Sequence, residues 1–353
     1  MFYSMSLVIF SIIIVITHIF NRDTKISHDI HPALAFVLIW GAIIWLSMVE
    51  GGQGTIVTLP PAERALYKES HPITAMICER AHKGDNLNRY LIGRQFLVVL
   101  IVFVINVSGG PLKGPEVLGL SQIVIEIFLN SGVAMILLTT IVGQLTSQVN
   151  AAHCMLDYIN THFMTTTLYV ALAIEASGLL HSVYLVQNLC SVLTGKPIET
   201  FEEPRSTIAN IFFWGRVVMS VAILGFAFAV TLTGLFQGKT TAWPGIPSSV
   251  SVILFFVLMC IVGTLEGMQI AFFAVAKLPV AERGTGKLAL ATCDLLFNLP
   301  GFMIGRQICV TMNFFVVARL TSLNIDVDAG DQTMFGVSPA MQKFFNTGFP
   351  RSS

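Results

Sequence analysis

Charged residues are scarce in this sequence of 353 residues, at 11% of the chain, whereas hydrophobic residues make up 54%. Soluble domains carry about 25% charged residues, so the composition excludes an ordinary soluble protein and is typical of a polytopic membrane protein. The formal net charge is +0, which gives no electrostatic reason to expect a nucleic-acid partner. We therefore expect a multi-pass protein whose main partner is the lipid bilayer.

Motifs for disulfide frameworks, metal binding and catalysis are also missing. The six cysteines are scattered, and none forms a Cys-x-x-Cys pair. There is no His-Glu-x-x-His, no Gly-x-Ser-x-Gly and no phosphate-binding loop, so we predict that the chain is not an enzyme and has neither a metal site nor a cofactor. His153, Cys154 and Asp157 are potential zinc ligands, but they are too crowded in one short stretch, and an ordinary loop is favoured.

One pattern of four blocks occurs twice in the chain. The first copy comprises Glu-Gly-Gly-Gln at 50–53, Leu-Pro-Pro-Ala-Glu-Arg at 59–64, Asn-Leu at 86–87 and Ile-Gly-Arg-Gln at 92–95. The second comprises Glu-Gly-Met-Gln at 266–269, Leu-Pro-Val-Ala-Glu-Arg at 278–283, Asn-Leu at 298–299 and Ile-Gly-Arg-Gln at 304–307. Four blocks in the same order, each beside apolar runs, indicate an internal duplication.

Hydropathy predicts eight membrane-spanning helices, each near the roughly 20 residues that a bilayer requires. They are predicted at 5–20, 32–49, 91–107, 118–142, 163–186, 210–236, 250–276 and 301–320. The first run lacks a basic start and a small-residue cleavage site, so we interpret it as a span and not as a signal peptide. Residues 60–83 are predicted to form an interfacial helix broken at His71-Pro72, with a solvated loop as the alternative.

The second copy of the pattern is followed by two fewer spans than the first. We therefore predict an all-α polytopic membrane fold of inverted five-helix repeats, with the chain covering about eight of ten expected transmembrane helices. The first repeat and its connecting loop are predicted at 1–208, the truncated second repeat at 209–320 and a polar C-terminal segment at 321–353. Such repeats would place a substrate site near the membrane midplane, between the two halves.

The duplicated motifs put carboxylate, amide and guanidinium groups inside apolar sequence, where ionisable residues are costly and usually functional. In Glu-Gly-x-Gln the carboxylate and the amide are three residues apart and share one helical face. We predict that a small polyhydroxy solute is bound by Glu50, Gln53, Gln95, Glu266, Gln269 and Gln307. Supporting positions are predicted to be Gly93, Arg94, Gly305 and Arg306, with each arginine holding a carboxylate.

Structural roles are the alternative for these polar residues. The carboxylates are also suited to helix capping or interhelical contacts, and the arginines to reaching lipid headgroups. A second acid and base, Glu175 and Arg216, lie in neighbouring predicted spans and are candidates for an ion pair.

The double motif resembles the diatom silicic acid transporters, in which Glu-Gly-x-Gln is followed by Gly-Arg-Gln twice. Cys154-Met155-Leu156-Asp157 also resembles a motif of some members, and the resemblance covers nearly the whole chain. It implies a ten-helix transporter of orthosilicic acid in the plasma membrane, with sodium as the coupling ion and alternating access as the mechanism. The ten motif residues named above would then carry the family's roles, and a homo-oligomer is left open.

Two other functions fit the same residues. A passive channel for small neutral hydroxylated solutes would show no sodium dependence. A truncated silicic acid binding or regulatory protein would bind the solute without taking it up, because the predicted spans are two fewer than the ten that the resemblance implies. A membrane enzyme would need a nucleophile or metal set, which the sequence does not contain.

Overall fold

The computed structural model describes residues 2–24, 26–27, 30–59, 64–110, 119–130, 132–195, 197–198, 200–202, 204–238, 240, 246–276, 279 and 299–321. Every element in these residues is a helix, which confirms the predicted all-α class. The chain divides into two units, Met1–Gly225 and Phe226–Ser353. Most of the predicted polar segment 321–353 and the block at 278–283 lie outside the described residues.

Seven helices in the described ranges are long and apolar enough to cross a membrane, which confirms a polytopic membrane protein. They are Phe2–Phe20, Pro32–Thr58, Asn86–Gly109, Val133–His153, Thr207–Phe236, Ser248–Phe272 and Gly301–Ala318. Eight spans were predicted, and the difference lies in the region between 118 and 194. The predicted division into five-helix repeats stays a prediction.

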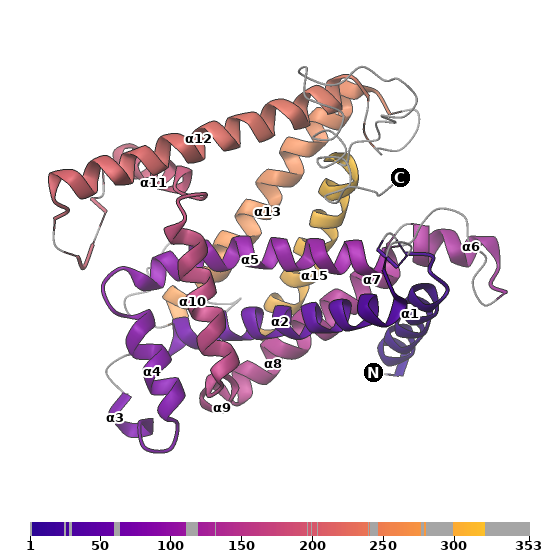
Figure 1. The fold of residues 1–353 in the computed structure, drawn as a ribbon, viewed down its shortest axis with the longest axis horizontal. Helices are drawn as coiled ribbons and strands as arrows, with labels where there is room; N and C mark the ends of the chain where they lie inside the picture. Colours follow the sequence, from indigo (N-terminus) through magenta and orange to yellow (C-terminus); the bar gives the residue numbers. More distant parts are fainter. Residues whose placement is uncertain are drawn as a thin grey trace. The chain divides into compact units, whose positions relative to one another are not determined.

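The centre of the first unit is formed by α2 (Pro32–Thr58) and α5 (Asn86–Gly109), which run alongside each other (Figure 1). They are antiparallel: Gly109 at the end of α5 lies against Ile39 near the start of α2, whereas Arg94 near the start of α5 contacts Val49. α1 (Phe2–Phe20) packs against α7 (Val133–Leu137) as well as α2, and α10 (His162–Ala176) packs against α5.

The second helix extends well beyond its predicted end at Val49. It continues to Thr58, so the Glu-Gly-Gly-Gln block lies inside the helix and not at its terminus. Glycines disfavour a helix, but here they permit close packing: a Cβ at Gly51 would lie 2.6 Å from the Tyr158 ring, and one at Gly52 would lie 2.6 Å from Met164. Packing against Tyr158 and Met164 therefore stabilises the helix at the two glycines.

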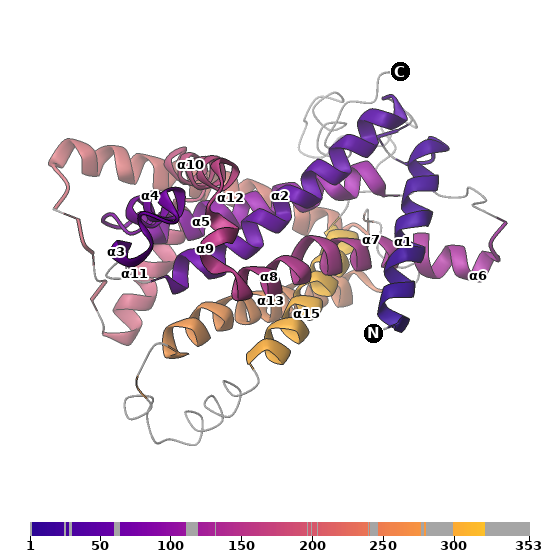
Figure 2. The same ribbon diagram turned by 90° about the horizontal axis from the view of Figure 1, so that it is seen from below.

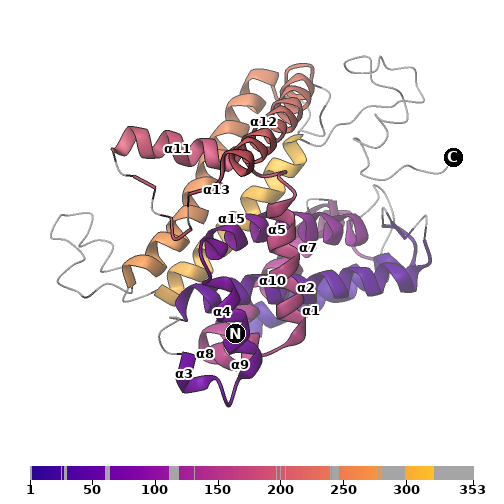
Figure 3. The same cartoon turned by 60° about the vertical axis from the view of Figure 1, so that its left-hand side comes forward.

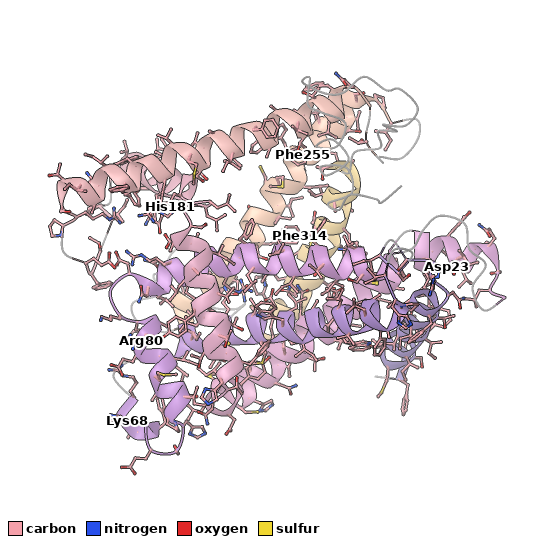
Figure 4. All side chains as sticks on the ribbon, viewed as in Figure 1. Asp23, Lys68, Arg80, His181, Phe255 and Phe314 are labelled. Carbon is pink, nitrogen blue, oxygen red and sulfur yellow. The ribbon has the colours of Figure 1, made fainter. Side chains whose placement is uncertain are left out.

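The predicted break at His71-Pro72 is confirmed. α3 (Arg64–Tyr67) and α4 (Pro72–Ala81) are separate helices, because proline at the start of α4 cannot continue the preceding turn. α4 buries Ile77 and Cys78 against the core of the first unit, whereas Lys68 and Arg80 are exposed and extend outward (Figure 4). The segment is thus a packed helical hairpin and not a loose loop.

The fourth predicted span is displaced along the chain. α6 (Gln122–Ile125) and the π-helical turn η2 (Glu126–Asn130) are followed by Gly132, whose φ of 83° is left-handed and ends that stretch. The spanning segment runs from Val133 to His153 through α7 (Val133–Leu137), the π-helix η3 (Leu138–Leu145) and α8 (Thr146–His153). The polar residues of α8 stay helical because α8 packs beside α2, as does the short α9 (Met155–Ile159) (Figure 2).

The prediction of one continuous fifth span at 163–186 is wrong. α10 ends at Ala176 and α11 (Ser182–Thr194) begins after a turn in which Gly178 has a φ of 85°. The turn is bound to α12 (Thr207–Phe236), where the Ser220 hydroxyl donates to the Leu179 carbonyl and accepts from the Ser182 amide. A left-handed glycine and these bonds stabilise a bend that hydropathy does not show.

The predicted pairing of Glu175 with Arg216 is also wrong. Glu175 accepts a 2.7 Å hydrogen bond from the Tyr184 hydroxyl across the bend, and its carboxylate is 3.9 Å from Nε2 of the buried His181. Arg216 instead donates to the carbonyl of Ala176. Both residues therefore stabilise the bend. Glu175 does so through the side chain of Tyr184, and Arg216 does so through a backbone carbonyl at the end of α10.

The second unit contains α13 (Ser248–Ala276) and α15 (Leu299–Thr321), which lie side by side (Figure 3). Their contact includes an edge-to-face pair of Phe272 and Phe302, with ring centroids 4.6 Å apart. Phe255 of α13 packs against Phe228, from the part of α12 that belongs to this unit. The helix pair carries the second Glu-Gly-x-Gln and Gly-Arg-Gln blocks.

Candidate functional site

A buried ion pair joins the two motif helices of the first unit. Nη2 of Arg94 is 2.8 Å from the Glu50 carboxylate, and the two side chains are 2% and 4% exposed. Arg94 also donates to the Val49 carbonyl at 3.4 Å and to Oε1 of Gln95 at 3.0 Å. The charge of the carboxylate is thereby compensated inside the protein, as burial requires.

Two residues that sequence reasoning did not find complete the surroundings of Glu50. Nε2 of Gln148, on α8, donates to the carboxylate at 3.3 Å. The Tyr158 hydroxyl, on α9, donates to the Ser47 carbonyl at 2.8 Å. Burial raises the pKa of Tyr158 to about 12, with the nearby negative charge of Glu50 adding to the effect and a hydrogen bond with Ser147 opposing it. Tyr158 is therefore a neutral phenol at physiological pH.

The second unit repeats these contacts around Arg306. Nη1 of Arg306 lies 3.4 Å from the Glu266 carboxylate and donates to the Leu265 carbonyl at 3.4 Å, while Nη2 donates to Oε1 of Gln307 at 2.6 Å. Each arginine thus contacts the motif glutamate, the carbonyl of the residue before it and the glutamine that follows the arginine. The predicted pairing of both arginines with the motif glutamates is confirmed.

The two sets differ in how they are covered. A Cβ at Gly93 would collide with the Ala171 carbonyl of α10, whereas one at Gly305 would meet nothing within 4 Å. Glu266 is correspondingly more open, with 24% of its side chain exposed. In the first unit α9 and α10 enclose the motif, and the described part of the second unit provides no equivalent cover for Gly305.

The predicted substrate ligands are divided between the units. Glu50, Gln53 and Gln95 belong to the first, and Glu266, Gln269 and Gln307 belong to the second. Gln53, Gln269 and Gln307 are buried, at 4%, 2% and 2% exposure, in helices that are otherwise apolar. Their convergence on one solute stays a prediction, as does the role of each side chain in binding.

The stretch around Cys154 does not form a metal site in the residues that the structure describes, where no group of three or more histidine, cysteine or acidic side chains could hold an ion. Instead, the Asp157 carboxylate lies 3.1 Å from Nε2 of His71. This contact links α9 to the start of α4. Cys154 is exposed and free.

These observations define a helical polytopic membrane protein in which two helix pairs each hold a glutamate–arginine pair within apolar surroundings. Ionisable groups in such places are usually functional, and the paths of transported solutes are among the sites where they occur. A family model described as silicon transporter matches residues 1–352, and the chain therefore belongs to the silicon transporter family. No curated protein and no solved structure matches the chain.

Proposed function

We propose that the protein transports orthosilicic acid across the plasma membrane together with sodium, by alternating access. The observation that carries the proposal is the paired set of contacts around Arg94 and Arg306. We infer that the two sets belong to internal repeats. In inverted repeats a two-fold axis would bring equivalent side chains toward one solute.

The chemistry of the motifs suits an uncharged, hydroxylated solute. Each glutamate is already balanced by an arginine, so neither set offers an uncompensated charge for an ionic substrate. Glutamine amides supply both donors and acceptors, as a solute covered with hydroxyl groups requires. In Gln95 the carbonyl oxygen accepts from Arg94, which orients the amide nitrogen as a donor. Sodium would be held by oxygen ligands and not by an uncompensated charge, and Glu266 is the more open of the two carboxylates.

Uptake of radiolabelled silicic acid, or of its germanium analogue, into proteoliposomes tests this function. We expect uptake above that of empty liposomes, with acceleration by an inward sodium gradient. Uptake that does not depend on the sodium gradient would favour a passive channel for small neutral hydroxylated solutes. Binding without uptake would favour a binding or regulatory membrane protein.

Substitution of the glutamines tests the site separately. Gln→Ala at 53, 95, 269 and 307 should each weaken apparent affinity about twofold to tenfold, because a net hydrogen bond contributes about 0.5–1.5 kcal/mol. Wild-type transport by all four variants in folded protein would show that the motifs are structural.

A further inference from the structure

Of the buried side-chain polar atoms in the first unit that have no hydrogen-bond partner in the described residues, two belong to the motif helices close to the Glu50–Arg94 pair. They are the hydroxyl of Tyr90, on α5, and Oε1 of Gln53, on α2. The side chains are deeply enclosed, since Tyr90 is 0% exposed and Gln53 is 4% exposed. Buried polar groups in folded proteins are nearly always bonded, and an unpaired one costs about 1–3 kcal/mol. Because these two atoms lie on the helices that carry the motif, a solute is a candidate for their missing partner.

Helix geometry places Tyr90 and Gln53 on the helical faces that carry the ion pair. Tyr90 lies four residues before Arg94 on α5, and Gln53 lies three residues after Glu50 on α2, so each shares a helical face with one member of the pair. Because α2 and α5 are antiparallel, both steps lead in the same direction along the helix pair. The Tyr90 hydroxyl is 3.9 Å from a Cβ built at Gly52, which fixes it next to the Glu-Gly-Gly-Gln block.

Packing around the Tyr90 ring prevents the hydroxyl from turning elsewhere for a partner. The ring belongs to an apolar cluster that includes Ile77, Cys78, Met164 and Leu168. A phenol has only two rotatable side-chain torsions, and an enclosed ring holds its oxygen in one place. The hydroxyl is therefore presented in a fixed position beside the charges of Glu50 and Arg94.

The duplication supplies an internal comparison. Aligning the two Ile-Gly-Arg-Gln blocks places Phe302 opposite Tyr90, four residues before the arginine in each copy. Phe302 needs no hydrogen-bond partner and packs against the Phe272 ring of α13. At this position the two copies therefore differ by one hydroxyl group, which only the first possesses.

We propose that the Tyr90 hydroxyl and Oε1 of Gln53 bind a hydroxyl group of the transported solute, and that this makes the first unit the more selective of the two for hydroxylated solutes. The inference rests on the proposed function. Oε1 of Gln53 accepts a hydrogen bond from one solute hydroxyl, and the tyrosine hydroxyl donates a hydrogen bond to a solute oxygen. A solute without a hydroxyl at this point would leave both atoms unpaired, which is how buried polar sites discriminate between solutes.

The test is Tyr90→Phe, which removes the oxygen and keeps the ring. We expect KM for silicic acid uptake to rise about twofold to tenfold with little change in the maximal rate. Without solute, the purified variant should be at least as thermally stable as wild type, because it loses an unpaired buried hydroxyl. Addition of silicic acid should raise its melting temperature less than that of wild type. Tyr169→Phe is the matched control, since Tyr169 of α10 is 48% exposed, and it should behave as wild type.

Other results would overturn the proposal. An unchanged KM for Tyr90→Phe, with wild-type uptake intact, would show that the solute does not contact the hydroxyl. A lower melting temperature without solute, together with an unchanged KM, would assign the hydroxyl to a structural water. If the wild type neither takes up nor is stabilised by silicic acid, the proposed function itself fails, and this outcome is distinct from both.

Discussion

At the scale of single residues, the Glu50–Arg94 pair shows why the motif contains both charges. Neither group is exposed, and each makes the burial of the other tolerable. Arg306 is equally buried, but its partner Glu266 keeps 24% of its side chain exposed. Loss of the arginine should therefore have unequal consequences in the two units.

We expect Arg94→Ala to destabilise the folded protein by about 3–5 kcal/mol, because Glu50 would remain buried without its counter-charge. Arg306→Ala should cost less, since Glu266 is less enclosed by the protein than Glu50. Chemical unfolding of the purified protein in detergent, followed by circular dichroism, measures both. The double variant Glu50→Gln/Arg94→Gln should recover part of the loss, because neither charge then remains unpaired. A double variant less stable than Arg94→Ala would show that charge pairing is not the cause.

At the scale of elements, the close contact between α5 and α10 depends on a missing side chain. Gly93 lies against the Ala171 carbonyl, and backbone atoms have little freedom to move away. Gly305 occupies the corresponding place on α15 and has open space around it. Gly93 therefore has a packing role in the first unit. The described residues of the second unit show no such role for Gly305.

Alanine at the two positions makes this difference measurable. Gly93→Ala should destabilise the protein by about 1–3 kcal/mol, the usual cost of overpacking, because α10 must shift. Gly305→Ala should be neutral or stabilise by up to about 1 kcal/mol, because alanine favours helix. Melting temperatures measured in the same detergent provide the comparison. An equal loss of stability at both positions would mean that the collision with α10 is not the reason why alanine at position 93 is destabilising.

The connection between α11 and α12 is bound to the start of α5. Asp85 accepts from the Thr200 hydroxyl at 2.7 Å and from the Phe201 amide at 3.1 Å, and Arg89 pairs with Glu202 at 2.7 Å. Burial alone would raise the pKa of Asp85, but these two hydrogen bonds and the charges of Arg89 and Arg205 hold the pKa below its usual value. The carboxylate is therefore ionised when the connection is bound.

Acid should release this connection. Because the pKa is lower in the folded state, the stabilisation is present above the ordinary aspartate value of about 3.9 and is lost as the pH falls through the folded pKa. The effect should be at most about 1 kcal/mol, since Asp85 is only partly buried. Amide hydrogen exchange at 200–202, corrected for its intrinsic pH dependence, should increase over that range. Asp85→Asn should show the faster exchange at neutral pH, and a variant as protected as wild type would refute the role of the charge.

At the scale of the whole molecule, the two helix pairs belong to separate units, and their mutual direction is a prediction from the duplication. If the repeats are inverted, α5 and α15 cross the membrane in opposite directions. Single cysteines at the equivalent positions Leu91 and Met303, in an otherwise cysteine-free protein, should then be labelled by impermeant maleimides from opposite faces. Labelling from the same face would rule out inverted repeats and would move the expected solute site.

Much of the fold was predictable because a helix that crosses the hydrocarbon core of a bilayer needs a long run of apolar residues. Long apolar runs located six of the seven spans in the described residues, with the fourth displaced along the chain, and His71-Pro72 marked a break that proline imposes anywhere. The bend at Gly178 was not predictable, because apolar residues on both sides produce the same hydropathy as a straight helix. What creates the bend is the bonding of Ser220 to the turn, a contact between distant parts of the chain.

The sequence alone determined the family, the membrane setting and the pairing of glutamate with arginine, because a charge inside an apolar helix requires a compensating partner. Only the tertiary structure decided that Gln148, Tyr158 and Tyr90 surround the same block. The π-helix η3 precedes Gln148 and alters the residue-per-turn count, so linear spacing does not reveal which face meets Glu50. Which side chain reaches a given atom depends on how helices pack, and that information is distributed over distant residues.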